Sequence, residues 1–185
     1  GVRTDISAVD PHYHVYVPNR TLARHIFDSL YHTQPNGNIV GGLATSWQVI
    51  GDDVWEIKLR QGVRFHDGTP FTADDVVFTL ARAPHVPNSP SSYALYTKLI
   101  AKVEAVDANT VRITTKGAAP TLPVDLSGIA IISRKAAEGK ATSDFNSGKA
   151  AIGTGPYRFV EWLPGNRVTV ARNPDYWGEK EPWER

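Results

Sequence analysis

Three stretches of this chain alternate apolar and polar residues on both sides of a turn-forming tripeptide, and this pattern restricts the fold more than any other feature. They span residues 45–62, 102–116 and 155–173. Their central tripeptides are Gly51-Asp52-Asp53, Asp107-Ala108-Asn109 and Pro164-Gly165-Asn166. Alternation with a period of two places apolar side chains on one face of a strand, and Gly, Pro, Asn and Asp favour tight turns. The sequence therefore predicts three β-hairpins.

A helical pattern follows the N-terminal residues. Leu22, Ile26 and Leu30 recur at i, i+4 and i+8, which places them on one face of a helix, and we predict that helix over residues 19–31. The other predicted elements are helices at 73–83, near 121–126 and near 133–138, strands near 2–6 and 15–17, and a long loop at 139–156. Helices and antiparallel hairpins without a βαβ rhythm predict an α+β fold (mixed α/β).

Composition excludes several classes of function. The 185 residues include no cysteine, which excludes disulfides, thiolate nucleophiles and cysteine-ligated zinc. Lys and Arg number 20 against 19 Asp and Glu, so the charge field is weak and we expect no nucleic-acid partner. No apolar run reaches the roughly 18 residues that cross a bilayer. Because methionine is also absent, we expect the chain to begin after processing or to be a cut piece, with any signal peptide outside it.

Four ionisable side chains fall within ten residues of one another: His66, Asp67, Asp74 and Asp75. Such a group could form a metal or acid–base site, but structural roles explain it better. Asp67 followed by glycine is a strong hairpin-turn signal. Asp75 stands three residues after Thr72, as in a capping box, and acidic residues in the first turn of a helix contribute about 0.3–1 kcal/mol each. We therefore predict scaffold roles and no metal site here.

His12 and His14 stand two residues apart in the segment DPHYHVY. On an extended strand their side chains would project to the same face, as zinc ligands can. The residues alone leave three alternatives open: imidazoles of an ordinary loop, the lining of a ligand pocket, or a metal-dependent hydrolase that uses both histidines and an Asp. No serine stands in a nucleophile elbow and no paired carboxylates share a plausible cleft. We therefore predict no enzyme, no catalytic residue and no cofactor.

Three long stretches carry a family resemblance: DPHYHVYVPNRTLARHIFDSLYHTQPNGNIVGGLATSWQV, WEIKLRQGVRFHDGTPFTADDVVFTLAR and IGTGPYRFVEWLPGNRVTVARNPDYWGEKEP. They resemble the solute-binding proteins of family 5, which are the peptide, dipeptide, oligopeptide and nickel receptors of bacterial ABC importers. The resemblance covers nearly the whole chain, in order. It implies the periplasmic-binding-protein type II fold, in which two lobes close over a ligand that is then delivered to a membrane permease.

The resemblance also implies a division of the chain. Residues 1–17 and 129–185 are expected to form part of the first ligand-binding lobe, and residues 18–128 the extra subdomain of this family. Family members are much longer than this chain, so we expect the second lobe to be missing from it. That lobe would supply the other half of the ligand cleft.

Candidate ligand-binding residues follow from two family segments. In oligopeptide receptors the extended segment after DPHYH runs beside the bound peptide, and the matching residues here are Val15, Tyr16 and Val17. His14 matches an aromatic position that lines the pocket of the nickel receptor. The family's S-P-Y loop corresponds to SPSSY, in which Ser91 takes the tyrosine position and Tyr93 follows two residues later. The candidate set is His14, Val15, Tyr16, Val17, Ser91 and Tyr93.

The resemblance implies a non-enzymatic function. We predict the substrate-binding component of a bacterial ABC importer that binds short peptides, with membrane permease subunits as partners and no metal or cofactor of its own. The alternatives are the same receptor class with an opine, an oligosaccharide, nickel or a metal chelate as ligand, and the hydrolase that uses His12 and His14. The expected location is the periplasm, or the outer face of the cell membrane through a lipid anchor.

Overall fold

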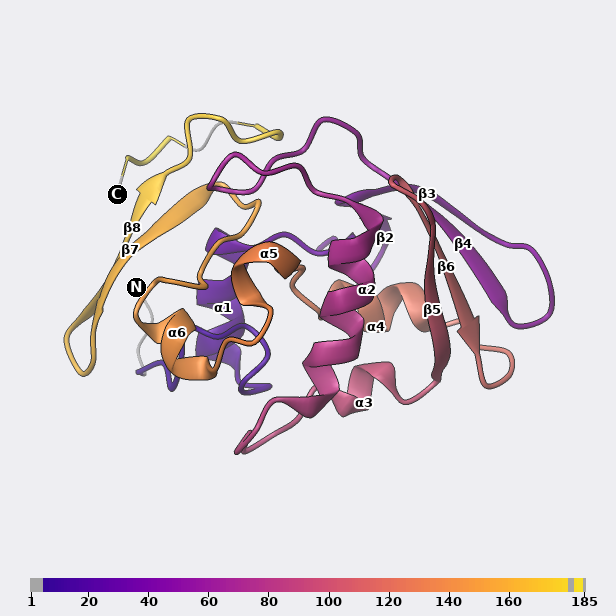
Figure 1. Ribbon diagram of the computed structural model, residues 1–185, viewed down its shortest axis with the longest axis horizontal. Helices are drawn as coiled ribbons and strands as arrows, with labels where there is room; N and C mark the ends of the chain where they lie inside the picture. The colour runs from indigo at the N-terminus through magenta and orange to yellow at the C-terminus, as the bar shows by residue number, and fades with distance from the viewer. Residues whose placement is uncertain (1–4, 180–181, 185) are drawn as a thin grey trace.

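The computed structural model describes residues 5–179 and 182–184. A four-stranded sheet lies on one side of the molecule and a two-stranded hairpin on the other, with helices α1, α2, α5 and α6 between them (Figure 1). The helices are α1 (Val17–Ile26), α2 (Ala73–Arg82), α3 (Ala94–Thr97), α4 (Leu122–Ser127), α5 (Arg134–Ala137) and α6 (Thr142–Asn146), with a 3₁₀ turn η1 (Ala83–His85) after α2. This mixture of helix and sheet confirms the predicted fold class.

The eight strands named below, all within the described residues, pair antiparallel, and the three predicted hairpins are confirmed. The strands are β1 (Tyr31–Thr33), β2 (Ile39–Gly41), β3 (Ala44–Val49), β4 (Val54–Leu59), β5 (Ile100–Asp107), β6 (Thr110–Thr115), β7 (Tyr157–Leu163) and β8 (Arg167–Arg172). The large sheet has the order β3-β4-β6-β5, while β1 pairs with β2 and β7 with β8. Ile57, Val111 and Ile113 are fully buried on one face of the large sheet, as the two-residue period requires.

The first helix begins and ends earlier than predicted. It runs from Val17 to Ile26 instead of 19–31, with Pro18 in its first turn, where a missing N–H costs nothing. Phe27 takes an extended conformation, and its N–H still bonds the carbonyl of Ala23 at 2.7 Å. The extended piece predicted at 15–17 therefore stops at Tyr16. The strand predicted near 2–6 lies partly outside the described residues, and residues 5 and 6 form no strand.

The predicted loop at 139–156 contains a helix that the pattern did not indicate. Helix α6 begins where the Ala141 N–H donates to the Asp144 carboxylate at 3.0 Å. A single apolar side chain, Phe145, holds this helix on the core and is fully buried. One apolar residue in a polar, glycine-rich stretch gives no periodicity, so the correction rests on tertiary packing. No helix in the described part of the chain has the length and apolar character to cross a bilayer.

Two hydrophobic clusters divide the molecule. The larger is built from buried residues between Leu30 and Ile131 and includes the inner face of the large sheet and the face of α2 around Val76. The smaller joins α1, through Leu22 and Ile26, to residues that follow position 131, with the hairpin β7–β8 packed against it. Helix α1 therefore depends on a part of the chain that is distant from it in sequence.

The loop before β7 passes against the end of α1 without room for a side chain. The Gly155 N–H donates to the Ile26 carbonyl at 3.0 Å. A Cβ atom on Gly155 would stand 2.6 Å from the Ile26 carbonyl carbon, and one on Gly153 would overlap the Ile26 carbonyl oxygen. The lack of a side chain at these two positions therefore allows the two backbone segments to lie in contact.

Gly153→Ala is expected to lower the free energy of unfolding by about 1–3 kcal/mol, because the backbone of Ile26 must shift to admit the methyl group. Gly51→Ala is the matched control, since its added Cβ would meet nothing closer than 3.9 Å. Urea denaturation of both variants measures the difference. Equal stability of the two variants would contradict the close approach.

Candidate ligand-binding edge

Two segments distant in sequence lie side by side at the candidate site. His14 and Ser91 form a parallel β-bridge, and the Val15 N–H donates to the Ser91 carbonyl at 3.0 Å. The Ser89 hydroxyl donates to the Tyr13 carbonyl at 2.6 Å. The structure thus brings the segment after DPHYH next to the SPSSY loop. We call residues 14–17 together with Ser91 the candidate edge.

Side chains of the candidate edge are accessible to different degrees. Val17 is 74% exposed, whereas His14, Val15, Tyr16 and Ser91 are half-buried. The rings of His14 and Tyr16 stack with centroids 5.1 Å apart and an interplanar angle of 20°. His14 is also held at its other side, where its Nδ1 lies 3.1 Å from the Ser7 hydroxyl. These contacts fix the rings while leaving part of each at the surface.

Tyr93, the sixth predicted ligand-binding residue, is not exposed at this edge. Its side chain is 1% exposed, with its ring 5.7 Å from those of His12 and Tyr96. Burial raises the pKa of Tyr93 to about 12. The ring therefore supports the edge from beneath.

His12 and His14 do not share a face, because residues 11–13 form a turn instead of a strand. His12 is fully buried, and its Nε2–H donates to the Ala130 carbonyl at 2.7 Å. Its Nδ1 accepts from Arg82 at 3.1 Å, so the ring is held as a neutral tautomer. Burial lowers the pKa of His12 to about 4. A pair of histidines presented to a metal or a substrate is therefore not formed.

A buried ion pair lies beside His12. Arg82 donates to both carboxylate oxygens of Asp10, at 2.6 and 3.1 Å, and Asp10 is fully buried. The Thr142 hydroxyl donates to the same carboxylate at 2.9 Å, and the Arg82 guanidinium lies 4.6 Å from the Phe145 ring centre. Although burial opposes ionisation of Asp10, the nearby Arg82 lowers the pKa of this carboxyl below its ordinary value. The pair ties α2 to α6 and to the turn that precedes the candidate edge.

The acidic residues of the stretch 64–82 have the predicted structural environments. Asp67 accepts from the N–H and the hydroxyl of Thr69 at 3.0 and 2.6 Å, which closes the turn around glycine 68. Asp75 accepts from the Thr72 N–H at 2.9 Å at the start of α2 and from the Arg134 N–H at 2.8 Å at the start of α5. Within residues 5–179 and 182–184, no three His, Cys, Asp or Glu side chains are placed to hold a metal ion.

His66 has a role that the sequence did not indicate. Its Nδ1 accepts from the Gly153 N–H at 3.3 Å and its Nε2–H donates to the Gly155 carbonyl at 3.0 Å. The ring therefore clamps the glycine loop that passes behind α1. Burial lowers the pKa of His66 to about 4, so the imidazole is neutral at pH 7.

Asp28 is a second connection that sequence reasoning missed. Its carboxylate is buried and accepts from Trp177 Nε1 at 2.8 Å, the Thr154 hydroxyl at 2.9 Å and the Tyr176 hydroxyl at 3.3 Å. Burial raises the pKa of this carboxyl above its ordinary value. An acidic residue inside the apolar run HIFDSLY was the available signal. Asp28 fastens the C-terminal segment to the end of α1.

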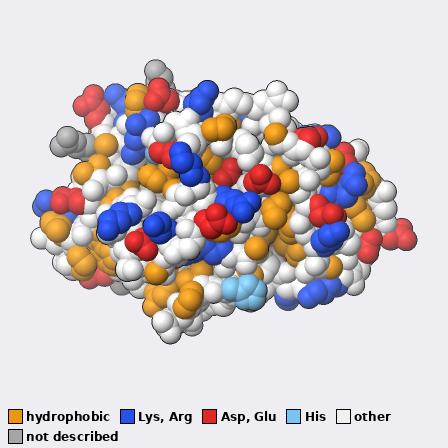
Figure 2. Space-filling model, in the orientation of Figure 1, with side chains coloured by type: hydrophobic (Ala, Val, Ile, Leu, Met, Phe, Trp, Pro, Cys, Tyr) orange, Lys and Arg blue, Asp and Glu red, His pale blue; other side chains and the backbone are white. Residues whose placement is uncertain are grey.

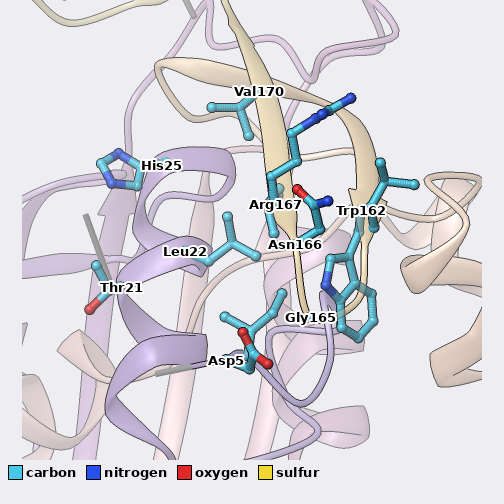
Figure 3. A pocket seen from close by; sticks show the side chains of 12 residues that line it. Asp5, Thr21, Leu22, His25, Trp162, Gly165, Asn166, Arg167 and Val170 are labelled. Atoms are coloured by element: carbon cyan, nitrogen blue, oxygen red, sulfur yellow. The ribbon is translucent and has the colours of Figure 1, made fainter. Parts of the chain in front are cut away.

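A cavity of about 420 Å³ lies on the other side of α1, between this helix and the hairpin β7–β8. Figure 3 shows Leu22 and His25 of α1 facing Trp162 and Val170 of the hairpin across it. None of the candidate ligand-binding residues lines this cavity. On the face shown in Figure 2, basic and acidic side chains are interspersed.

Comparisons with known proteins agree in family and in fold. Residues 38–185 match the model of bacterial extracellular solute-binding proteins, family 5, middle region. The glutathione-binding protein GsiB of Pectobacterium atrosepticum is 32% identical over 179 residues, which are 95% of this chain and 34% of that protein. The periplasmic oligopeptide-binding protein OppA of Escherichia coli is 28% identical over 94% of this chain and 35% of its own length. The chain thus spans about a third of these relatives.

A solved structure is similar to this chain in both sequence and fold. NikZ from Campylobacter jejuni, in complex with Ni(L-His), has a TM-score of 0.85 and 31% sequence identity over 97% of this chain and 36% of its own. The fold is therefore that of the periplasmic binding proteins of type II, as predicted. Together with the family-model match over residues 38–185, these likenesses establish that the chain belongs to the bacterial extracellular solute-binding proteins of family 5.

Proposed function

We propose that this chain is the N-terminal part of a substrate-binding receptor of a bacterial ABC importer, and that the receptor binds short peptides. Family membership carries the proposal. The candidate edge supports it through the side chains that it leaves at the surface, since Val17 is exposed and His14, Tyr16 and Ser91 are only half-buried. The permease subunits and the periplasm, or the outer face of the cell membrane, complete the proposed setting.

The proposed ligand cleft has its first wall at the candidate edge. His14, Val15, Tyr16, Val17 and Ser91 would contact the ligand, with Tyr93 supporting them from the core. The second wall would come from a lobe outside this chain. Closure of two lobes around a hinge would then bury the ligand and create the surface that a permease binds.

We also propose that residues 1–26 and 129–185 belong to the first lobe and residues 27–128 to the extra subdomain, which moves the first boundary predicted at residue 17 to the end of α1. The two hydrophobic clusters support a division of this kind, since one is built between residues 30 and 131 and the other mainly from residues outside that range. Helix α1 packs in the second cluster, which supports a first boundary after α1 instead of before it.

Ligand-dependent melting of the full-length receptor tests the function. A ligand at one hundred times its Kd is expected to add about 2.7 kcal/mol to the free energy of unfolding. The panel contains short peptides, glutathione, an opine, an oligosaccharide and nickel with histidine. Native mass spectrometry of the receptor, purified without denaturation, would identify a ligand that it already carries. A receptor that carries nothing and is stabilised by no member of the panel would refute the proposal.

The hydrolase alternative makes the opposite prediction. Peptide hydrolysis by this chain that disappears in His14→Ala would establish an enzyme. We expect no turnover, because His12 is fully buried and His14 does not face it. His85→Ala, at an exposed histidine outside the candidate edge, controls for loss of an imidazole.

A further inference from the structure

Helix α1 carries two arginines that pair with no carboxylate among the described residues. Arg20 and Arg24 are four residues apart and lie on one side of the helix, where two like charges oppose each other. Arg20 donates to the Tyr96 hydroxyl at 3.1 Å and lies over that ring, so its partner is neutral. Among the described residues no hydrogen bond or ion pair joins the exposed Arg24 side chain to another group. Segment 17–26 itself has no acidic residue.

Both arginines line a groove between α1 and α4. Two adjoining cavities, of about 20 and 170 Å³, share Arg24, Phe27, Ser29 and Ser127. Arg20 lines the narrow end, together with the backbone of residue 128. The Ser29 and Ser127 hydroxyls already donate to backbone carbonyls, at 3.0 and 2.7 Å, so the donors left for an anion are the two guanidinium groups. Their N–H groups can bind both oxygens of a carboxylate.

The groove begins next to the candidate edge. Arg20 is one helical turn after Tyr16, and Tyr93, which lines the narrow end, is two residues after Ser91. Asp28 lines the wide end, where its carboxylate already accepts from three side chains. An anion would be repelled from that end and attracted to the end with the two arginines.

We propose that Arg20 and Arg24 bind a carboxylate of the transported ligand, so that the receptor selects anionic or zwitterionic solutes with a free carboxylate, such as the C-terminus of a short peptide. The proposal rests on the proposed receptor function. A ligand that lies along the candidate edge would place its carboxylate at the mouth of the groove, between the two guanidinium groups, since the narrow end itself has room for about one water molecule. This contact would also relieve the repulsion between the two arginines.

The test compares two probes on the full-length receptor: tri-alanine with a free C-terminus and tri-alanine amide. Isothermal titration calorimetry should show the amide to bind about tenfold or more weakly, as expected for the loss of hydrogen bonds to a charged group. Arg24→Gln and Arg20→Gln should weaken the free acid by a similar factor and leave the amide unchanged. Arg134→Gln, which removes an exposed arginine paired with Glu138, is the matched control and should change neither.

Three results would overturn the assignment. Equal affinity for acid and amide would show that the ligand carboxylate is not bound. An equal loss for both probes in Arg24→Gln would show that the arginine pairs with another part of the receptor. Failure to bind either probe would reject a peptide carboxylate in this groove, and the melting panel would then decide independently whether the chain belongs to a receptor. Unchanged circular dichroism of each variant verifies its fold.

Discussion

Arg82→Met is expected to lower the free energy of unfolding of this chain by about 3–5 kcal/mol, because it leaves the fully buried Asp10 carboxylate without its cation. Methionine keeps an apolar stem but loses the guanidinium, which also lies over Phe145 and donates to His12, so the loss reports on the ion pair together with these two contacts. Denaturant titration at pH 7 measures it. The effect would be a large fraction of the 5–15 kcal/mol that is usual for a folded domain.

Two further variants make this result specific. Arg134→Met breaks an exposed pair with Glu138 and should cost less than about 1 kcal/mol. The double variant Asp10→Leu/Arg82→Met removes both charges and should recover much of the stability, since buried pairs are often replaceable by apolar side chains. If Arg82→Met costs no more than Arg134→Met, the buried pair does not stabilise the fold as described.

The second large effect is loss of stability in mild acid. His12 and His66 have ordinary pKa values of 6.5, and burial lowers both to about 4 in the folded chain. Below pH 6.5 the unfolded chain therefore binds more protons than the folded one, and stability falls as the pH falls towards 4. Each imidazole contributes a slope of up to about 1.4 kcal/mol per pH unit in this window.

The hydrogen bonds of the two imidazoles also explain why protonation destabilises the folded chain. In both rings Nδ1 accepts a hydrogen bond, from Arg82 in one case and from the Gly153 N–H in the other, so a proton on that nitrogen would face a donor. Asp28 and Asp75 act in the opposite sense, because burial raises the pKa of each and the folded chain then binds their protons more readily. They reduce the loss near the acid end of the window.

Urea unfolding at a series of pH values between 7 and 4 measures the slope. His66→Gln removes one of the two titrating groups and should reduce the slope by about half, whatever its effect on stability at pH 7. His85→Gln, at an exposed position, should leave the slope unchanged. A slope that is flat from pH 6.5 to 4 in the unmodified chain would contradict neutral, buried imidazoles.

Sequence patterns predicted the parts of this fold that depend on neighbours in the chain. The hairpins followed from alternation and turn residues, and the start of α2 followed from Thr72 and Asp75, because these signals act over a few residues. The end of α1 was predicted too late, since Leu30 continues the helical period although the backbone is already extended at Phe27. A local pattern cannot predict that change, because the extended residues 28 and 29 are held by residues 130 and 131, which are distant in sequence.

The candidate site was predictable only in part. The family resemblance selected the two segments that the structure places side by side at His14 and Ser91. It did not indicate that Tyr93 is buried or that a turn separates His12 from His14. The positions of Asp28, His66 and the groove arginines depend on contacts between residues far apart in sequence, which no local pattern encodes. The ligand-binding roles stay predictions until a ligand is measured.

The packing of α1 has a consequence for the order in which the chain can fold. As the polypeptide emerges from the ribosome, the apolar stripe of α1 around Leu22 and Ile26 lacks most of its buried partners until residues 132 to 170 have been synthesised. The cluster between residues 30 and 131 can assemble first, leaving that stripe exposed to chaperones. The N-terminal helix would then be among the last elements to dock, so a nascent chain that stalls before β7 would remain only partly folded.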